Sequence, residues 1–167
     1  GRVRDFYGNF LVVVKAFAYL TMLGREGVHE VGRNAVLNAN YMMAALKDTY
    51  DMAYPGPCMH EFVMTLDRLH KETGVSALDI AKGLLDNGIH PPTMYFPLIV
   101  HEALMVEPTE TESKATMDEA IAVFRLLARL AHEDPDALHT APHNTPVRRL
   151  DEVQAARNPV LRAVFAE

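Results

Sequence analysis

Two runs of apolar positions at the start of the chain predict two helices. Residues 10–23 are apolar on nearly every side, with Asn9 as N-cap and Gly24 as the stop. Residues 26–47 place apolar side chains at steps of three and four, which indicates one buried face. The first helix is shorter than the roughly 20 residues that a membrane span requires. We therefore expect it to be buried against a protein surface larger than this domain supplies.

The middle of the chain alternates between strand and helix patterns. Apolar positions predict a strand over 58–66, and Ser76 with Asp79 three residues later predicts a capped helix that ends at Gly88. A second strand is expected over 103–107.

The last third of the chain predicts a long helix and then an arm. Thr109 or Thr111 is the expected cap of a helix that runs to about His132, and residues 151–157 form one further short helix. Two or three strands make a thin antiparallel or mixed sheet with helices covering one face, so the fold class is α+β. We divide the chain into an apolar interdomain helix (1–24), an α+β small domain (25–133) and a C-terminal arm (134–167).

Composition narrows the function classes. The chain has 167 residues, 49% of them hydrophobic and 23% charged, which is typical of a globular domain. A net charge of −6 argues against a nucleic-acid partner. The single cysteine, Cys58, excludes an internal disulfide and fits a reducing compartment. No signal-peptide pattern follows Gly1, so we expect a cytoplasmic protein without a membrane segment, and a piece of a longer chain.

The residues do not supply a complete catalytic set. Histidine–glutamate pairs at 60–61 and 101–102 begin a zinc-binding pattern, but methionine occupies the second ligand position in both. Lys71 follows a histidine, as a Schiff-base lysine often does, yet it lies in a polar run where it would be solvated. We assign no catalytic residue and no metal ligand.

The most informative segment is 88–113, where a glycine stop, a proline-stiffened arm, a strand and a polar turn follow one another. It carries most of the candidate site residues: His90, Thr93, Glu107, Thr109 and Glu110. Spacing alone favours a structural interpretation, an edge strand followed by a turn and a cap. The pair Gly8-Asn9 offers free backbone N–H groups to a ligand, but spacing alone favours simple helix capping.

Several long motifs resemble a known family. They are residues 35–41 (AVLNANY), 59–62 (MHEF), 88–93 (GIHPPT), 104–112 (LMVEPTETE) and 145–152 (TPVRRLDE), with FYGNF at 6–10. In order and along essentially the whole chain, they resemble the C-terminal portion of the glycine cleavage system P-protein, glycine decarboxylase, most closely subunit 2 of its two-subunit form.

The resemblance implies the small C-terminal domain of a fold-type-I pyridoxal-phosphate enzyme. Such an enzyme decarboxylates glycine and transfers the aminomethyl group to the lipoyl arm of the H-protein. Its partners would be a large pyridoxal-phosphate-binding domain, which carries the cofactor lysine, and subunit 1. By position, Gly8, Asn9, His90, Thr93, Glu107, Thr109 and Glu110 would line the approach of substrate or lipoyl arm.

Two alternatives remain open at this point. In one of them the chain is the small domain of another fold-type-I pyridoxal-phosphate decarboxylase or aminotransferase. Aminotransferases usually need a small-domain arginine for the substrate carboxylate, and none lies between Arg68 and Arg125. The other alternative is a non-catalytic interaction module that binds a partner through its apolar helix.

Overall fold

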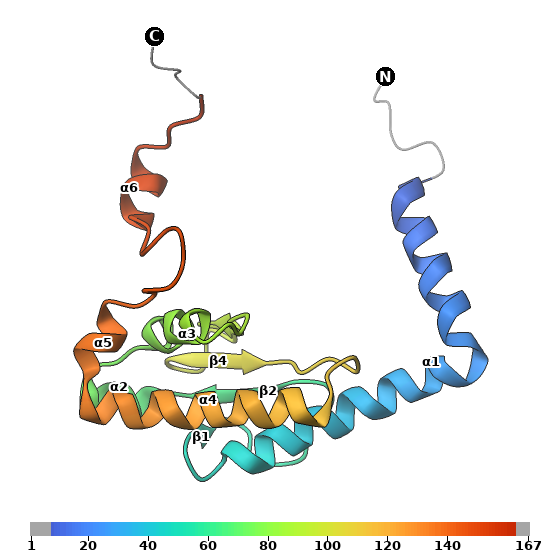
Figure 1. Cartoon of the computed structure of the whole chain (residues 1–167), viewed down its shortest axis with the longest axis horizontal. Helices are drawn as coiled ribbons and strands as arrows, with labels where there is room; N and C mark the ends of the chain where they lie inside the picture. The colour runs from blue at the N-terminus through green and yellow to red at the C-terminus, as the bar shows by residue number, and fades with distance from the viewer. Residues whose placement is uncertain (1–7, 163–167) are drawn as a thin grey trace.

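The computed structural model describes residues 8–162, so Phe6, Tyr7 and the outer ends of segments 1–24 and 134–167 lie outside it. Figure 1 shows one sheet with helices around it and an arm at each end of the chain. The elements are α1 (Phe10–Leu46), β1 (Asp51–Met52), β2 (Phe62–Thr65), α2 (Asp67–Thr73), α3 (Ala77–Asp86), β3 (Thr93–Met94), β4 (Ala103–Val106), α4 (Lys114–Glu133), α5 (Pro135–His139) and α6 (Glu152–Arg157).

The sheet is antiparallel throughout, in the order β1-β2-β4-β3. The central pair, β2 and β4, aligns Phe62 with Val106 and Thr65 with Ala103. Three of the four residues of each strand are buried, so side chains on both faces of this pair are covered, whereas the sequence predicted cover on one face only. The expected α+β class with a thin sheet is confirmed.

The core lies between the sheet, α3, α4 and the second half of α1. Its largest wholly buried side chains are Leu46, Met64, Leu66, Ile80, Leu84, Leu104, Leu127 and Leu138. Tyr50 fastens the end of α1 to α4 because its buried hydroxyl donates a 2.7 Å hydrogen bond to the Phe124 carbonyl. Burial raises the pKa of Tyr50, so it remains a donor.

Helix α1 is bent at Gly24, whose φ of 65° suits glycine far better than other residues. The expected stop at this glycine is therefore a kink between two helical halves. Asn9 caps the first half, as expected, by accepting a hydrogen bond from the Val12 N–H. This half projects from the body (Figure 1), and residues 8–22 are all exposed; Phe10 is 76% exposed and Met22 77%.

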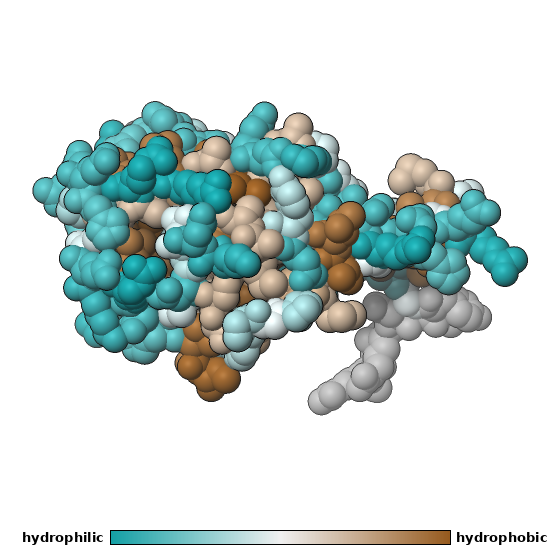
Figure 2. Space-filling model, turned by 90° about the horizontal axis from the view of Figure 1, so that it is seen from below, coloured by the Kyte–Doolittle hydropathy of each residue, from teal (hydrophilic) through white to brown (hydrophobic). Residues whose placement is uncertain are grey.

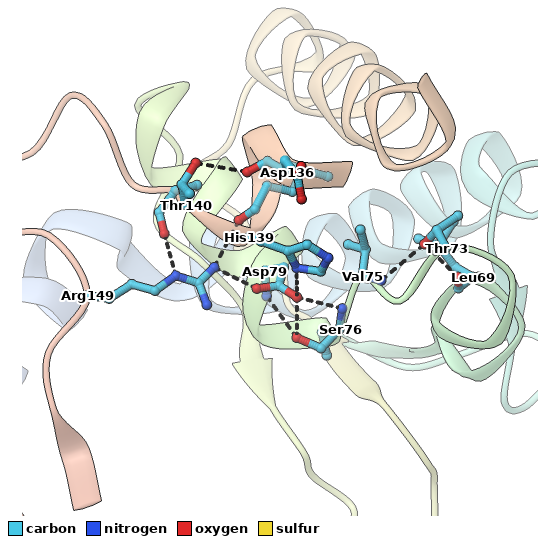
Figure 3. A network of polar contacts seen from close by, with 12 residues as sticks. Leu69, Thr73, Val75, Ser76, Asp79, Asp136, His139, Thr140 and Arg149 are labelled. Atoms are coloured by element: carbon cyan, nitrogen blue, oxygen red, sulfur yellow. Dashed lines mark hydrogen bonds and ion pairs between the residues drawn. The ribbon is translucent and has the colours of Figure 1, made fainter. Parts of the chain in front are cut away.

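The C-terminal arm is fastened to α3 by buried Asp79. Arg149 donates to the Asp79 carboxylate at 2.6 Å and to the carbonyls of Leu138 and Ala141, while Ser76 and His139 contact the other carboxylate oxygen (Figure 3). Burial acts to raise the pKa of Asp79, but the Ser76 amide, the Ser76 hydroxyl and the Arg149 guanidinium outweigh it and lower the pKa. Asp79 also completes the predicted capping box of α3.

Two local expectations were wrong, and two short helices were not expected. The strand expected over 58–66 is limited to β2, because Asn40 holds the backbone of Cys58 in a loop. Helix α4 is capped by Ser113, since the Thr109 and Thr111 hydroxyls bond to each other. The polar run after Leu66 forms α2, which Gly74 ends in a left-handed conformation, and Asp134-Pro135 begins the unexpected helix α5.

Within residues 8–162, no helix combines the length and apolar character needed to cross a membrane. Figure 2 shows hydrophilic residues over most of the face that it views, with separate hydrophobic patches between them.

Candidate functional site

A groove of about 750 Å³ opens beside the edge of the sheet. It is bounded by the segment 87–93, by β4 and the turn after it, and by one face of α4. Four of the candidate site residues line it: His90, Thr93, Glu107 and Thr109. The stiff arm and the polar turn, which strand β4 separates along the chain, therefore border the same groove.

The arm reaches the groove because of how α3 ends. The N–H groups of Gly88 and Ile89 bond to the carbonyls of Leu85 and Leu84, and Gly88 adopts a φ of 72°. This is the Schellman motif, in which the residue after the helix adopts a left-handed conformation that glycine tolerates without steric cost. Beyond it, β3 pairs with β4 through Thr93 and Met105, which fixes the arm at the edge of the sheet.

The groove has an apolar floor and an acidic rim. Met42, Val106, Met117 and Phe124 are buried side chains that line it. The rim carries the carboxylates of Glu61, Glu107, Glu112 and Glu119. No lysine or arginine is among the lining residues within the described part of the chain. Such a lining favours a neutral aliphatic ligand over a small anion.

Asn38 holds the polar turn in place, a role that sequence reasoning missed. Its side chain is 93% buried, and its amide donates hydrogen bonds to the carbonyls of Thr109 (2.9 Å) and Glu112 (3.4 Å). The Glu112 carboxylate in turn accepts from the Thr116 hydroxyl on α4. The turn between β4 and α4 is therefore bonded to α1 on one side and to α4 on the other.

Asn40 performs the same task for the loop that carries Glu61. Its side chain accepts from the Cys58 N–H at 3.0 Å and donates to the Cys58 carbonyl at 2.8 Å. A signal was present in the sequence, since two asparagines two positions apart on a largely apolar helix require partners. Their partners are distant along the chain, so the sequence did not identify them.

The other three candidate residues do not line the groove. The Glu110 carboxylate accepts a 2.6 Å hydrogen bond from the Tyr19 hydroxyl, which lowers the pKa of Glu110. Gly8 and Asn9 lie at the free end of α1, away from β4 in Figure 1. Asn9 serves there as the helix cap.

The lysines of the described chain do not fit a covalent cofactor site. Lys15, Lys47, Lys71 and Lys114 are exposed and Lys82 is only half-buried, whereas a Schiff-base lysine needs a desolvated surrounding that lowers its pKa. The Asp118 carboxylate instead raises the pKa of Lys114. The described residues also contain no group of three or more histidine, cysteine or acidic side chains that would hold a metal ion.

The described residues thus form an α+β unit in which a stiff arm and a polar turn border one groove. The family model described as "Glycine dehydrogenase, C-terminal domain" matches residues 31–143. The chain belongs to this family.

Curated relatives match the sequence along nearly the whole chain. It is 60% identical over 162 residues to a "Probable glycine dehydrogenase (decarboxylating) subunit 2" of Treponema denticola, covering 97% of this chain and 34% of the relative. A protein of the same name from Thermosipho africanus is 54% identical, and the match covers 100% of this chain and 35% of that relative. Another from Desulforamulus reducens is 57% identical, and the match covers 96% of this chain and 33% of that relative. The chain therefore spans about a third of the length of the curated relatives that it matches.

Proposed function

We propose that this chain is the C-terminal part of subunit 2 of a glycine dehydrogenase (decarboxylating). The intact enzyme would decarboxylate glycine and transfer the aminomethyl group to the lipoyl arm of the H-protein. The observation that carries the proposal is the match to the family and to relatives of that name, at 54–60% identity along almost the whole chain. Its partners would be a large pyridoxal-phosphate-binding domain, subunit 1 and the H-protein, in the cytoplasm.

Pyridoxal phosphate is the cofactor that the family implies for the intact enzyme, where it would accept the electrons left when glycine loses carbon dioxide. Because the described lysines do not fit it, no chemical step is assigned to this chain. We propose that the chain instead shapes the approach to a site completed by other parts of the protein. The 167 residues alone would be inactive.

We assign the groove to the lipoyl arm. A lipoyl group on its lysine is long, uncharged and largely aliphatic, and it suits an apolar floor better than the zwitterion glycine does. Thr93 and Thr109 would offer hydroxyl groups, and His90 an imidazole, to the amide of the arm. The carboxylates of Glu107 and Glu112 would discourage other anions from entering. Glu110 would contribute indirectly, because its bond to Tyr19 holds the first half of α1 near this entrance, and Asn9 after Gly8 would cap the free end of that half.

Release of labelled carbon dioxide from carboxyl-labelled glycine tests the function. The full-length subunit that contains this chain is mixed with subunit 1, lipoylated H-protein and pyridoxal phosphate. We expect release that requires every component, and none from the 167-residue chain alone. Release by this chain with cofactor only, or no release by the complete mixture, would contradict the proposal.

A further inference from the structure

Two segments, one near each end of the chain, expose apolar side chains outside the core. The first is the projecting half of α1 (residues 10–23), where Phe17 is 72% exposed and Leu20 54%. The second is the outer arm (residues 145–162), where Leu150 is 66% exposed and Val153 61%. Clusters of exposed apolar side chains of this kind mark surfaces that another part of a protein covers.

Polar contacts fix the outer arm where it leaves the body. The Asp86 side chain on α3 is only 12% exposed, and its carboxylate accepts from the N–H groups of His143 at 2.6 Å and Asn144 at 2.7 Å. The His143 imidazole lies 3.0 Å from the same carboxylate. Farther along the chain, Arg149 is bonded to Asp79, also on α3. The start of the arm is therefore held at two points, two helical turns apart.

The projecting half of α1 is held in a similar way, because the Tyr19 hydroxyl donates a hydrogen bond to the Glu110 carboxylate. Figure 1 shows that the two segments rise from opposite ends of the domain, on the side of the sheet where α3 lies and away from α4. One body placed on this side would therefore contact both segments.

We propose that the two segments hold one body, and that this body is the part of the subunit that precedes residue 1. This inference rests on the function proposed above. The chain covers only 33–35% of its relatives, and the matching family model describes a C-terminal domain. The greater part of the subunit therefore joins the domain at the free end of the projecting half. Because it is joined covalently there, its effective concentration at both segments exceeds that of a separate chain.

The consequence for the site is a fixed orientation. The projecting half of α1 leads from the preceding part of the subunit into the domain, and the outer arm returns to it. A grip at both ends of the domain sets how the groove faces that part of the subunit. The outer arm is thus a positioning element that contributes no residue to the groove within the described chain.

Hydrogen exchange of the full-length subunit, compared with the 167-residue chain, tests the proposal. Peptides over 10–23 and 145–157 report on the two segments, and peptides over β2 and β4 are the internal control. We expect both segments to exchange at least about tenfold more slowly in the full-length subunit without subunit 1, whereas the control peptides agree. Exchange that is equally fast in both proteins would overturn the proposal.

Other occupants give different results. Protection that appears only after subunit 1 is added would assign the segments to subunit 1. Protection of the 167-residue chain that increases with its concentration would assign them to a second copy, and either result overturns the proposal. Protected segments in a subunit whose complete mixture releases no carbon dioxide support this inference and contradict only the proposed function. Unprotected segments in an active subunit overturn this inference alone.

Leu150→Ser tests the outer arm within the full-length subunit itself. We expect exchange at residues 151–157 to become at least about tenfold faster, because a leucine buried against the rest of the subunit is lost. Leu37→Ser is the matched control, since Leu37 is also 66% exposed but lies on the second half of α1, with buried Asn38 and Leu46. Equal exchange at 151–157 in the two variants would overturn the assignment of the outer arm.

Discussion

The Tyr19 hydroxyl donates a 2.6 Å hydrogen bond to the Glu110 carboxylate, joining the projecting half of α1 to the turn before α4. The two residues are 91 positions apart. Because Gly24 bends the helix between Tyr19 and the body of the domain, this bond helps to fix the direction of the projecting half. It thereby connects an exposed apolar helix with the rim of the groove.

Tyr19→Phe tests this connection through the acidity of Glu110. The hydrogen bond from Tyr19 stabilises the charged carboxylate and lowers the pKa of Glu110. We expect the pKa to rise towards its ordinary value in Tyr19→Phe, as measured by carboxyl ¹³C shifts during a pH titration. Tyr54→Phe, at another exposed tyrosine, is the control and leaves it unchanged. A Glu110 pKa that is the same in both variants would exclude the hydrogen bond in solution.

Asn38→Ala is expected to weaken the turn and the whole domain. The substitution leaves the carbonyls of Thr109 and Glu112 without their buried donor, which costs about 1–3 kcal/mol of the free energy of unfolding. Asn34→Ala, one turn earlier and exposed on the same helix, is the matched control and is neutral or slightly stabilising. Urea denaturation measures both. Hydrogen exchange at residues 109–112 accelerates only in Asn38→Ala if Asn38 orders the turn.

Arg149→Gln removes the ion pair that fastens the C-terminal arm, and its effect depends on pH. The pKa of Asp79 is lowered in the folded state, so the pair stabilises the fold at neutral pH and this contribution is lost as pH falls through the lowered pKa. We expect a loss of about 1–3 kcal/mol at neutral pH that becomes smaller in acid. Part of the loss of stability persists in acid, because Arg149 also donates hydrogen bonds to two carbonyls.

Arg148→Gln controls for the change of one surface charge beside Arg149. Denaturant unfolding from neutral to acidic pH compares the two variants. A deficit in Arg149→Gln that is independent of pH would show that the carbonyl bonds alone fasten the arm.

Gly83→Ala probes the packing of α3 against α4 and α5. A methyl group there would lie 2.9 Å from a Leu127 side-chain carbon and 3.0 Å from a Leu138 carbon, so the leucines must move. We expect a loss of about 1–3 kcal/mol. Gly32→Ala on α1 meets no atom within 4 Å and is expected to stabilise the helix by about 0.5–1 kcal/mol. Thermal unfolding of both variants checks the opposite signs.

The parts of the fold that the sequence predicted depend on neighbouring residues. Asn9, Ser76 and Asp151 cap helices by bonding to N–H groups three residues later, so the local pattern was sufficient. The two-residue strand β1 exists because it pairs with β2, and no local pattern marks so short an element.

The candidate site was predicted only in part, because some of its residues are neighbours in the sequence and others are not. His90, Thr93, Glu107 and Thr109 lie in a single segment whose stiffness is visible in the sequence, and the structure gathers them around one groove. Asn38 and Asn40 were not predicted, because their partners are 71 and 18 positions away. The acidic rim likewise combines Glu61 from a loop with Glu119 from α4, which only the tertiary fold brings together.

If the lipoyl arm enters the groove, a charge placed in the lining of the groove should hinder it, and kinetics of the complete enzyme with Ala120→Glu measure this effect. Ala120 lines the groove on α4, whereas Ala122 is exposed on the same helix and does not line it, so Ala122→Glu is the matched control. We expect the KM for lipoylated H-protein to rise at least about tenfold in Ala120→Glu alone, because a charge enters the apolar lining, while the KM for glycine is unchanged. An unchanged KM for H-protein in a folded Ala120→Glu enzyme would contradict entry of the lipoyl arm into the groove.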